Sequence, residues 1–324
     1  MKRPYSFLFV GLGLVVASLA FAATENSPVT KKLTWAGCGI SKNAFMAEMV
    51  AAYKKKTGIE VELKGGGATK GIREVASQEV NIGGTCRHVI EDTKTYMTLP
   101  EERRVQLTPV AWDALVVIVH KDNPVNNITL AQVREIYTGK ITNWRELGGK
   151  NEPVELYVRK GKISGVGRTL RELVFANYDQ EFTATHVVES SGPLERAIVE
   201  NPRGIGITGI SSARKLKAKI LMLNGKEPSY ENIKKGDYLL YRPLYMVTRM
   251  QLKPEPEIQK FLDFVMGPEG QQVMRSVGTV PYQDGIHLWL KYLDQQNKAI
   301  ANMRGKADEN GAKTPKVKGK SKTP

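Results

Sequence analysis

Short apolar segments with the spacing of strands alternate with amphipathic helical segments through most of the 324-residue chain. Residues 33–36, 59–63 and 80–84 have the β-branched or alternating pattern of strands, and the first two are followed by glycines and then by a predicted helix. The first helix places Phe45 and Met49 on one apolar face. A succession of such units predicts an α/β protein whose sheet is mainly parallel and covered by helices on both faces.

Loops that contain glycine, or in one case directly follow two glycines, lie at the carboxyl ends of the predicted strands, where α/β sheets bind their ligands. These loops are residues 37–41, 65–69, 85–88 and 159–166. Glycine lets a ligand approach the backbone, and a helix that starts in such a loop exposes unpaired N–H groups and the positive end of its dipole. The recurrence of these loops therefore predicts an anion-binding site.

The charge of the chain also favours anionic partners. Lysine and arginine outnumber aspartate and glutamate by 48 to 33, which gives a formal net charge of +15. The length suits two lobes of ordinary domain size, and 41% hydrophobic residues are typical of a globular protein. Because the body has no dense basic run and no basic-aromatic stripe, a small anion is predicted and nucleic acid is not.

The first 22 residues have the features of a cleaved signal peptide. Lys2 and Arg3 precede an apolar run over residues 7–19, and residues 20–22, Ala-Phe-Ala, form a small-x-small cleavage pattern. The run is shorter than the roughly 18 residues that a membrane-spanning helix needs. We therefore expect a periplasmic or secreted protein without a stable membrane anchor.

The other end of the chain is strongly basic and almost without apolar residues. Residues 304–324 contain seven lysines or arginines against Asp308 and Glu309. Such a segment cannot bury enough apolar surface to order itself, so a disordered basic tail is predicted.

Four segments of the body resemble the phosphate-binding periplasmic proteins of high-affinity ABC importers. They are residues 128–144, 201–206, 241–245 and 261–270, of which the first, ITLAQVREIYTGKITNW, is the most specific. The resemblance implies the type II periplasmic binding protein fold, an α/β fold with two lobes, two hinge strands and a ligand cleft between the lobes. Such proteins work by hinge closure around the ligand.

The resemblance also implies an organisation and a function. Lobe one would comprise residues 23–119 and 236–303, with the last helices packed back on it, and lobe two would comprise residues 120–235. The protein would capture phosphate or a related small anion and deliver it to an ABC permease. A ligand sensor or scaffold without transport is the alternative, with a redox or metal link through Cys38 and Cys86.

The family's four ligand loops can be carried over onto this chain residue by residue. They give Gly39, Ile40, Ser41, Ala68, Thr69, Cys86, Arg87, Arg159, Lys160, Ser164, Gly165 and Val166 as ligand-binding residues. Among these, Arg87 is the cation that aligns without ambiguity. Glu189 and residues 190–192 are expected to cap the next helix and not to contact the ligand.

Several of these positions depart from the family pattern. Cys38 stands in a loop that is usually Gly-Ser-Thr, Cys86 takes the place of a serine or a proton-accepting aspartate, and Val166 replaces a threonine. Each lost hydrogen bond to a charged ligand costs roughly 1.5 to 3 kcal/mol. With no carboxylate in the aligned loops to accept the proton of phosphate, sulfate, a molybdate-like anion and an organic phosphate remain open as ligands.

The two cysteines leave three alternatives open. They can be inert buried thiols, a Cys38–Cys86 disulfide favoured by an oxidising compartment, or a thiolate site that binds a soft metal together with His88. No fourth ligand and no C-x-x-C spacing supports the metal, so none is predicted. Catalytic motifs such as G-x-S-x-G and H-E-x-x-H are absent from the sequence, so neither an enzyme activity nor a cofactor is predicted.

Overall fold

The computed structural model describes residues 32–92, 95, 97–251 and 255–311, with side chains up to Arg304. The expected signal peptide and residues 312–324 of the expected tail lie outside this part of the chain. Within it, no helix is both long enough and apolar enough to cross a membrane.

The strands alternate with helices along the chain, as the sequence predicts. The strands are β1 (Leu33–Gly37), β2 (Val61–Lys64), β3 (Ile82–Thr85), β4 (Val105–His120), β5 (Asn127–Ile128), β6 (Glu155–Arg159), β7 (His186–Val188), β8 (Gly204–Gly209), β9 (Ala218–Ile220), β10 (Met222–Leu223), β11 (Tyr241–Arg249) and β12 (Val280–Pro281).

The first helix is continuous over three labelled segments, α1, η1 and α2. The helices are α1 (Gly39–Ser41), the π-helical η1 (Lys42–Met46), α2 (Ala47–Thr57), α3 (Ala68–Ala76), α4 (Leu130–Tyr137), α5 (Gly165–Phe175), α6 (Ser191–Glu200), α7 (Ile210–Ala213), α8 (Tyr230–Lys235), α9 (Pro256–Met266), α10 (Pro268–Ser276) and α11 (Leu288–Gly311), with short 3-10 turns η2 (Pro100–Glu102), η3 (Trp144–Leu147) and η4 (Tyr282–Gly285).

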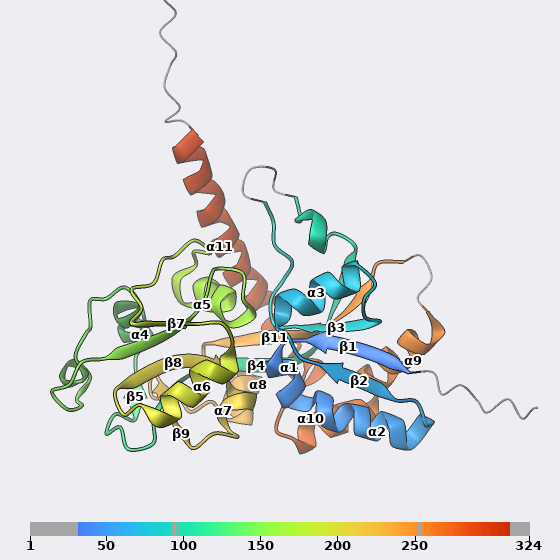
Figure 1. The fold of residues 1–324 in the computed structure, drawn as a ribbon, viewed down its shortest axis with the longest axis horizontal. Coiled ribbons are helices and arrows are strands. Elements are labelled where there is room, and N and C mark those ends of the chain that lie inside the picture. Colours follow the sequence, from blue (N-terminus) through green and yellow to red (C-terminus); the bar gives the residue numbers. More distant parts are fainter. Residues whose placement is uncertain (1–31, 93–94, 96, 252–254, 312–324) are drawn as a thin grey trace, which may run out of the picture. The chain divides into compact units, whose positions relative to one another are not determined.

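One sheet joins two α/β lobes, in the order β2-β1-β3-β11-β4-β8-β6-β7. Figure 1 shows β1, β2 and β3 with α2 and α3 in one lobe, and β7 and β8 with α5 and α6 in the other; β6 lies between β8 and β7. The long strand β4 belongs to both lobes, because it pairs with β11 as far as Ala114 and with β8 from Leu115 onward. The residue limits of the lobes expected from the sequence remain predictions. The structure shows that the pairing partner of β4 changes from β11 to β8 between Ala114 and Leu115.

The sheet is mixed and not mainly parallel. β1 pairs in parallel with β2 and β3, and β6 does so with β7 and β8, whereas β11 runs antiparallel to β3 and β4, and β4 antiparallel to β8. The expectation of a mainly parallel sheet fails at the centre, because β4 leaves lobe one and β11 enters it again in the opposite direction.

Glycines let α3 approach the strand ends closely, which positions the site. A Cβ at Gly84 would lie 2.2 Å from the ring of Trp35, and one at Gly37 would lie 2.6 Å from it. A Cβ at Gly71 of α3 would lie 2.6 Å from the carbonyl oxygen of Gly84. A side chain at Gly71 would therefore push α3 away from the ends of β1 and β3, whereas one at Gly84 or Gly37 would displace the ring of Trp35.

Helix α11 corrects two expectations (Figure 1). Its first turns lie near lobe one, where the ring of Tyr292 is 6.4 Å from that of Trp112. Farther along, Met303 packs with Tyr178, and Asn302 Nδ2 donates to the carbonyl oxygen of Ala176, 2.8 Å away, just after α5. The last helix therefore packs against both lobes and not on lobe one alone, whereas α9 and α10 pack against α2 as expected.

The predicted disordered tail does not begin at Arg304 either, because α11 continues to Gly311. Met303, only 4% exposed, anchors the helix immediately before this segment. A prediction based on apolar content alone misses a helix that is held in place by the residues before it.

Candidate anion-binding site

Helices α1, α3, α5 and α6 begin at one cavity of about 340 Å3. Its lining is Cys38, Gly39, Ile40, Gly66, Gly67, Ala68, Cys86, Arg159, Gly165, Val166, Glu189, Ser190, Ser191 and Gly192. α1 and α3 come from lobe one, and α5 and α6 come from lobe two. Because each helix N-terminus carries unpaired N–H groups and a positive dipole end, the cavity suits a small anion.

About half of the predicted site residues lie in this lining. They are Gly39, Ile40, Ala68, Cys86, Arg159, Gly165 and Val166. The sequence analysis missed Gly66, Gly67, Glu189, Ser190, Ser191 and Gly192. The sequence did contain a signal for the last four residues. A Ser-Ser-Gly segment follows β7 and begins a helix, in the same way that helices begin after β1, β2 and β6.

Four predicted residues outside the lining have local structural contacts instead. Ser164 caps α5 by accepting a hydrogen bond from Gly167 N at 3.1 Å. Ser41 is buried, with its hydroxyl 3.4 Å from Cys38 Sγ. Lys160 Nζ lies 2.7 Å from Glu189 Oε1 on the surface, and Thr69 Oγ1 donates to the carbonyl oxygen of Ile163 at 3.1 Å.

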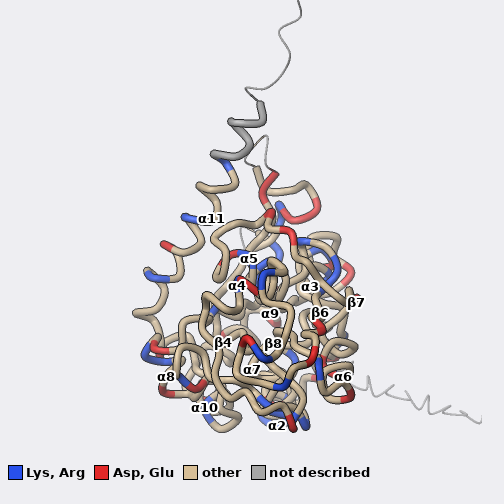
Figure 2. Tube along the Cα trace, turned by 90° about the vertical axis from the view of Figure 1, so that its left-hand side faces the viewer, with Lys and Arg blue, Asp and Glu red and all other residues tan. Residues whose placement is uncertain are grey.

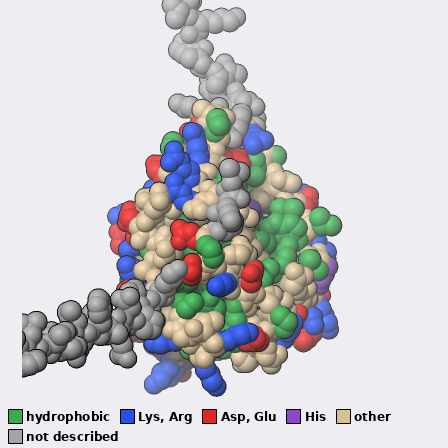
Figure 3. All heavy atoms as spheres, turned by 90° about the vertical axis from the view of Figure 1, so that its right-hand side faces the viewer, with side chains coloured by type: hydrophobic (Ala, Val, Ile, Leu, Met, Phe, Trp, Pro, Cys, Tyr) green, Lys and Arg blue, Asp and Glu red, His purple; other side chains and the backbone are tan. Residues whose placement is uncertain are grey.

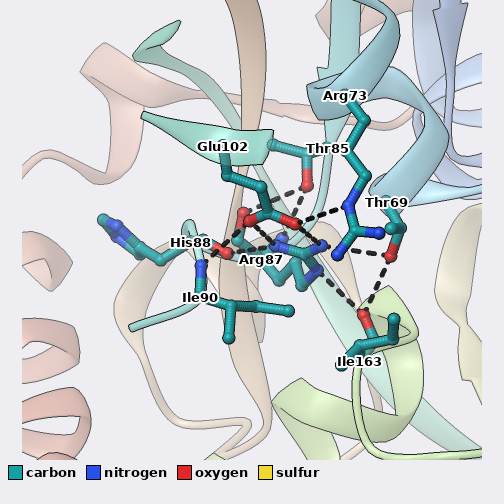
Figure 4. Close-up of polar contacts among 8 residues, drawn as sticks. All are labelled: Thr69, Arg73, Thr85, Arg87, His88, Ile90, Glu102 and Ile163. Carbon is teal, nitrogen blue, oxygen red and sulfur yellow. Dashed lines mark hydrogen bonds and ion pairs between the residues drawn. The ribbon is translucent and has the colours of Figure 1, made fainter. Parts of the chain in front are cut away.

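Arg87 also lies outside the lining, and every one of its five N–H donors has a partner. Figure 4 shows the guanidinium between Glu102, Thr69 and the loop that precedes α5. Nε donates to the carbonyl oxygen of Ile163 at 2.9 Å. Nη1 donates to the carbonyl oxygen of His88 at 2.6 Å and to Glu102 Oε2 at 3.0 Å. Nη2 donates to Glu102 Oε1 at 2.9 Å and to Thr69 Oγ1 at 3.0 Å. No donor is left for an anion in this arrangement, so Arg87 would have to break one of these contacts to bind the ligand, and its expected role stays a prediction.

The Glu102 carboxylate is held in its charged form. Burial alone would raise the pKa of Glu102, but the hydrogen bonds and charge of Arg87 outweigh it and hold that pKa below its ordinary value. Ile90 N adds a hydrogen bond to Glu102 at 2.9 Å, and Arg73 Nε lies 3.4 Å from it. This network joins the two lobes through Ile163 and has a structural function.

Arg159 is the cation that does line the cavity. Its Nη1 donates to Ser191 Oγ at 2.5 Å and its Nη2 to the carbonyl oxygen of Glu189 at 3.2 Å. Its buried Nε has no hydrogen-bond partner among the described residues. The side chain therefore retains a donor and a positive charge beside the start of α6, as recognition of an oxyanion requires.

The structure places the two cysteines side by side at the wall of the cavity. β1 and β3 are parallel neighbours with Gly37 opposite Gly84, and Cys38 N donates to the carbonyl oxygen of Gly84 at 3.0 Å. Both thiols are buried and free. The adjacency that the sequence could not decide is thus present, whereas the disulfide is not formed.

One of the two thiols is strongly acidic. The hydrogen bond from Cys86 lowers the pKa of Cys38 to about 6, helped by the charge of Arg242 and by Ser41, whose N lies 3.3 Å from Sγ, and opposed by burial. The pKa of Cys86 moves in the other direction, chiefly through the same hydrogen bond. Near neutral pH the pair therefore holds one thiolate and one thiol.

The counter-charge behind the cysteines is fully buried. Arg242 Nη2 lies 3.2 Å from Asp113 Oδ2, and both side chains are completely buried. Burial lowers the pKa of Arg242, but the charges of Cys86, Asp113 and Cys38 raise it by more. Its Nη1 has no hydrogen-bond partner among the described residues, so part of its charge is available to the thiolate.

His88 does not join the cysteines. Its Nε2 lies 2.6 Å from the hydroxyl oxygen of Tyr245, and its ring stacks on Tyr292. Burial, with the charges of Arg168 and Arg87, lowers the pKa of His88 to about 4. In the described part of the chain no three Cys, His, Asp or Glu residues are grouped to hold a metal ion, so the thiolate-histidine alternative has no structural support.

The surface does not suggest a polyanion partner. Figure 2 shows lysine and arginine positions spread over many elements, and on the face shown in Figure 3 basic, acidic and apolar side chains are interspersed.

Two α/β lobes that share long central strands and close on a cavity of helix N-termini define a two-lobe binding protein. Residues 22–269 match the PBP superfamily domain, and the chain belongs to this family. Helix α11 lies outside the matched region.

Two curated relatives of similar length resemble this chain over most of its residues. Protein SphX of Synechococcus elongatus is 29% identical over 283 residues, 82% of each chain, and the phosphate-binding protein PstS of Bacillus subtilis is 24% identical over 81% of this chain and 85% of its own.

Solved structures agree with the fold. A phosphate ABC transporter substrate-binding protein from Clostridium perfringens, described with bound phosphate, superposes with a TM-score of 0.68 at 26% identity over 78% of this chain and 99% of its own. An ABC-type phosphate transport receptor from Vibrio cholerae gives a TM-score of 0.59 at 22% identity over 78% of this chain and all of its own, which supports the fold alone.

Proposed function

We propose that this protein captures phosphate or a related small anion between its lobes and delivers it to an ABC permease. The observation that carries the proposal is the convergence of four helix N-termini, two from each lobe, on one cavity beside Arg159. An anion there is bound by both lobes only when they are closed, so its binding energy favours the closed state. The relative from Bacillus subtilis, which is named a phosphate-binding protein, supports this function over a sensor or scaffold.

Glu189 gives the site a carboxylate that the sequence analysis did not expect. It lines the cavity, and its side chain is largely exposed and paired with Lys160. Phosphate retains a proton near neutral pH, so Glu189 is the group that would accept it and favour phosphate over sulfate. The role of the missing family aspartate would thus pass to another loop.

The cellular setting follows from the same proposal. A protein that hands an anion to a permease acts outside the inner membrane, in agreement with the expected signal peptide over residues 1–22 and a periplasmic location. Binding and release are the whole of this function, and it includes no catalytic step.

The proposal is tested by thermal unfolding of the exported protein with phosphate, arsenate, sulfate, molybdate and an organic phosphate. An anion at 100 times its dissociation constant would stabilise the protein by about 2.7 kcal/mol. Arg159→Ala should abolish most of this effect, whereas Arg145→Ala, at an exposed position in lobe two, should retain it. Absence of stabilisation by every anion would contradict the proposed function.

A further inference from the structure

The wall of the cavity contains two sulfur atoms held in place from several sides. Cys38 Sγ accepts from Ser41 N at 3.3 Å and lies 3.4 Å from Ser41 Oγ. Cys86 Sγ packs against Gly165 of the other lobe, where an added Cβ would lie 2.4 Å from it. Both cysteines come from the ends of adjacent parallel strands, so their spacing is set by the sheet.

The negative charge at this wall disfavours a hard oxyanion as the sole kind of ligand. With the pKa of Cys38 at about 6, a thiolate faces the cavity near neutral pH, stabilised by Cys86 and by the buried Arg242. A thiolate repels an anion placed beside it. Sulfur ligands also select soft partners, whereas hydroxyls and carboxylates suit hard ones.

We propose that Cys38 and Cys86 form a dithiol site that binds trivalent arsenic or antimony hydroxide inside the anion cavity. This dithiol proposal rests on the proposed function only in that it places the ligand in the same cavity. Such hydroxides are uncharged near neutral pH and react with neighbouring thiols without any change of oxidation state. They are also close in size to the small oxyanions that the cavity suits.

The binding step is a condensation that forms two sulfur–arsenic bonds and breaks two arsenic–oxygen bonds. One As(OH)3, the Cys38 thiolate, the Cys86 thiol and one proton give a bridged Cys38–As(OH)–Cys86 and two waters. The remaining hydroxyl would lie among the N-termini of α3, α5 and α6, which can donate hydrogen bonds to its oxygen. Forming the bridge consumes the thiolate charge, which removes the repulsion within the site.

The test uses the exported protein, reduced with a phosphine that is then removed, and arsenite as the probe. Intact mass spectrometry should show one adduct equal to arsenous acid less two waters, with the loss of two titratable thiols. Because the second bond forms within the same site, Cys38→Ser and Cys86→Ser should each weaken arsenite binding by roughly a hundredfold or more. Absence of the adduct, or unchanged affinity in either single variant, would overturn the dithiol site.

Two controls separate this proposal from the proposed function. Ser41→Ala alters the surroundings of Cys38 but leaves both thiols, so it should retain the adduct. Phosphate and arsenate, which do not condense with thiols, should give no adduct with the unmodified protein, and cooperative thermal unfolding of the ligand-free cysteine variants shows that they are folded. Failure of every pentavalent anion with a positive arsenite result would refute phosphate capture and leave the dithiol site standing.

Discussion

Arg87 and Glu102 form a bidentate ion pair inside lobe one, with Nη1–Oε2 and Nη2–Oε1 distances of 3.0 and 2.9 Å and each residue 1% exposed. The same guanidinium donates to the carbonyl oxygen of Ile163 in lobe two. Thr169 Oγ1 of α5 adds a second contact between the lobes by donating to the carbonyl oxygen of Cys86 at 3.0 Å. Closure of the lobes is thus stabilised by protein contacts as well as by any ligand.

Removal of Arg87 should therefore affect stability first. Arg87→Ala leaves the buried Glu102 carboxylate with only the longer contact to Arg73 and the Ile90 N–H, and breaking a buried pair in this way costs about 3 to 5 kcal/mol. The free energy of unfolding in urea measures this loss. The double variant with Glu102→Ala should lose less than the sum of the two single variants, and strict additivity would contradict the pairing.

Glu102 should also give the stability a defined dependence on pH. Its folded-state pKa lies below the ordinary value of 4.5, so its contribution is present above about pH 4.5 and is lost as the pH falls through the folded-state value. The difference in unfolding free energy between the unmodified protein and Glu102→Gln should shrink as the pH is lowered below 4.5. A difference that stays constant down to acid unfolding would show that the carboxylate charge does not stabilise the fold.

The contrast between Arg87 and Arg159 shows what the sequence can and cannot predict. Arg87 follows β3 and Arg159 ends β6, and both stand in predicted ligand loops. The position of such a loop depends on a local pattern that can be read from the sequence. The partner that removes Arg87 from the site, Glu102, lies fifteen residues farther along in a short 3-10 turn. Where a guanidinium points depends on such tertiary contacts, so the sequence could not show that Arg159 lines the cavity and Arg87 does not.

The cysteines and α11 show the same distinction between local patterns, which the sequence reveals, and tertiary contacts, which it does not. The chain order of the first strands predicts that their loops lie at one edge of the sheet, but only the pairing of β1 with β3 brings Cys38 next to Cys86. The path of α11 across both lobes depends on isolated contacts such as Met303 with Tyr178. These contacts leave no periodic signal in the sequence beyond that of an ordinary helix.

The acidity of Cys38 can be measured directly. The ultraviolet absorbance of the thiolate in the reduced protein should titrate with a midpoint near pH 6. Cys86→Ala removes the hydrogen bond that contributes most to this shift, so the midpoint should rise toward the ordinary value of 9.0 or above it. Cys38→Ala should lack the step near pH 6, and a midpoint unchanged by Cys86→Ala would contradict the shared proton.

The last helix should contribute to stability through its final described turns. Met303→Ala removes a side chain that is 4% exposed and packs on Tyr178, and such core truncations cost about 2 to 5 kcal/mol. Deletion of residues 312–324, expected from the sequence to be a solvated tail, should change the unfolding free energy by no more than about 0.5 kcal/mol. Equal effects of the two changes would mean that α11 does not anchor through Met303.

The contact between Gly165 and Cys86 should control closure of the lobes. In Gly165→Ala the new Cβ would lie 2.4 Å from Cys86 Sγ and 2.9 Å from the Cβ of Ala68, so α5 must move away from lobe one. Overpacking of this kind costs about 1 to 3 kcal/mol, and because it acts only on the closed state it should weaken anion binding by roughly five- to a hundredfold.

Calorimetric titration of the anion that stabilises the protein, with small-angle scattering for the degree of closure, measures both consequences of Gly165→Ala. Gly65→Ala, where an added Cβ meets nothing within 4 Å, is the matched control and should bind normally. Adding Cys86→Ala to Gly165→Ala removes the sulfur from the clash and should restore part of the affinity, because the remaining Cβ–Cβ contact can relax with a smaller shift. If the double variant binds no better than Gly165→Ala, the sulfur is not the atom that limits the approach of α5 to the cavity.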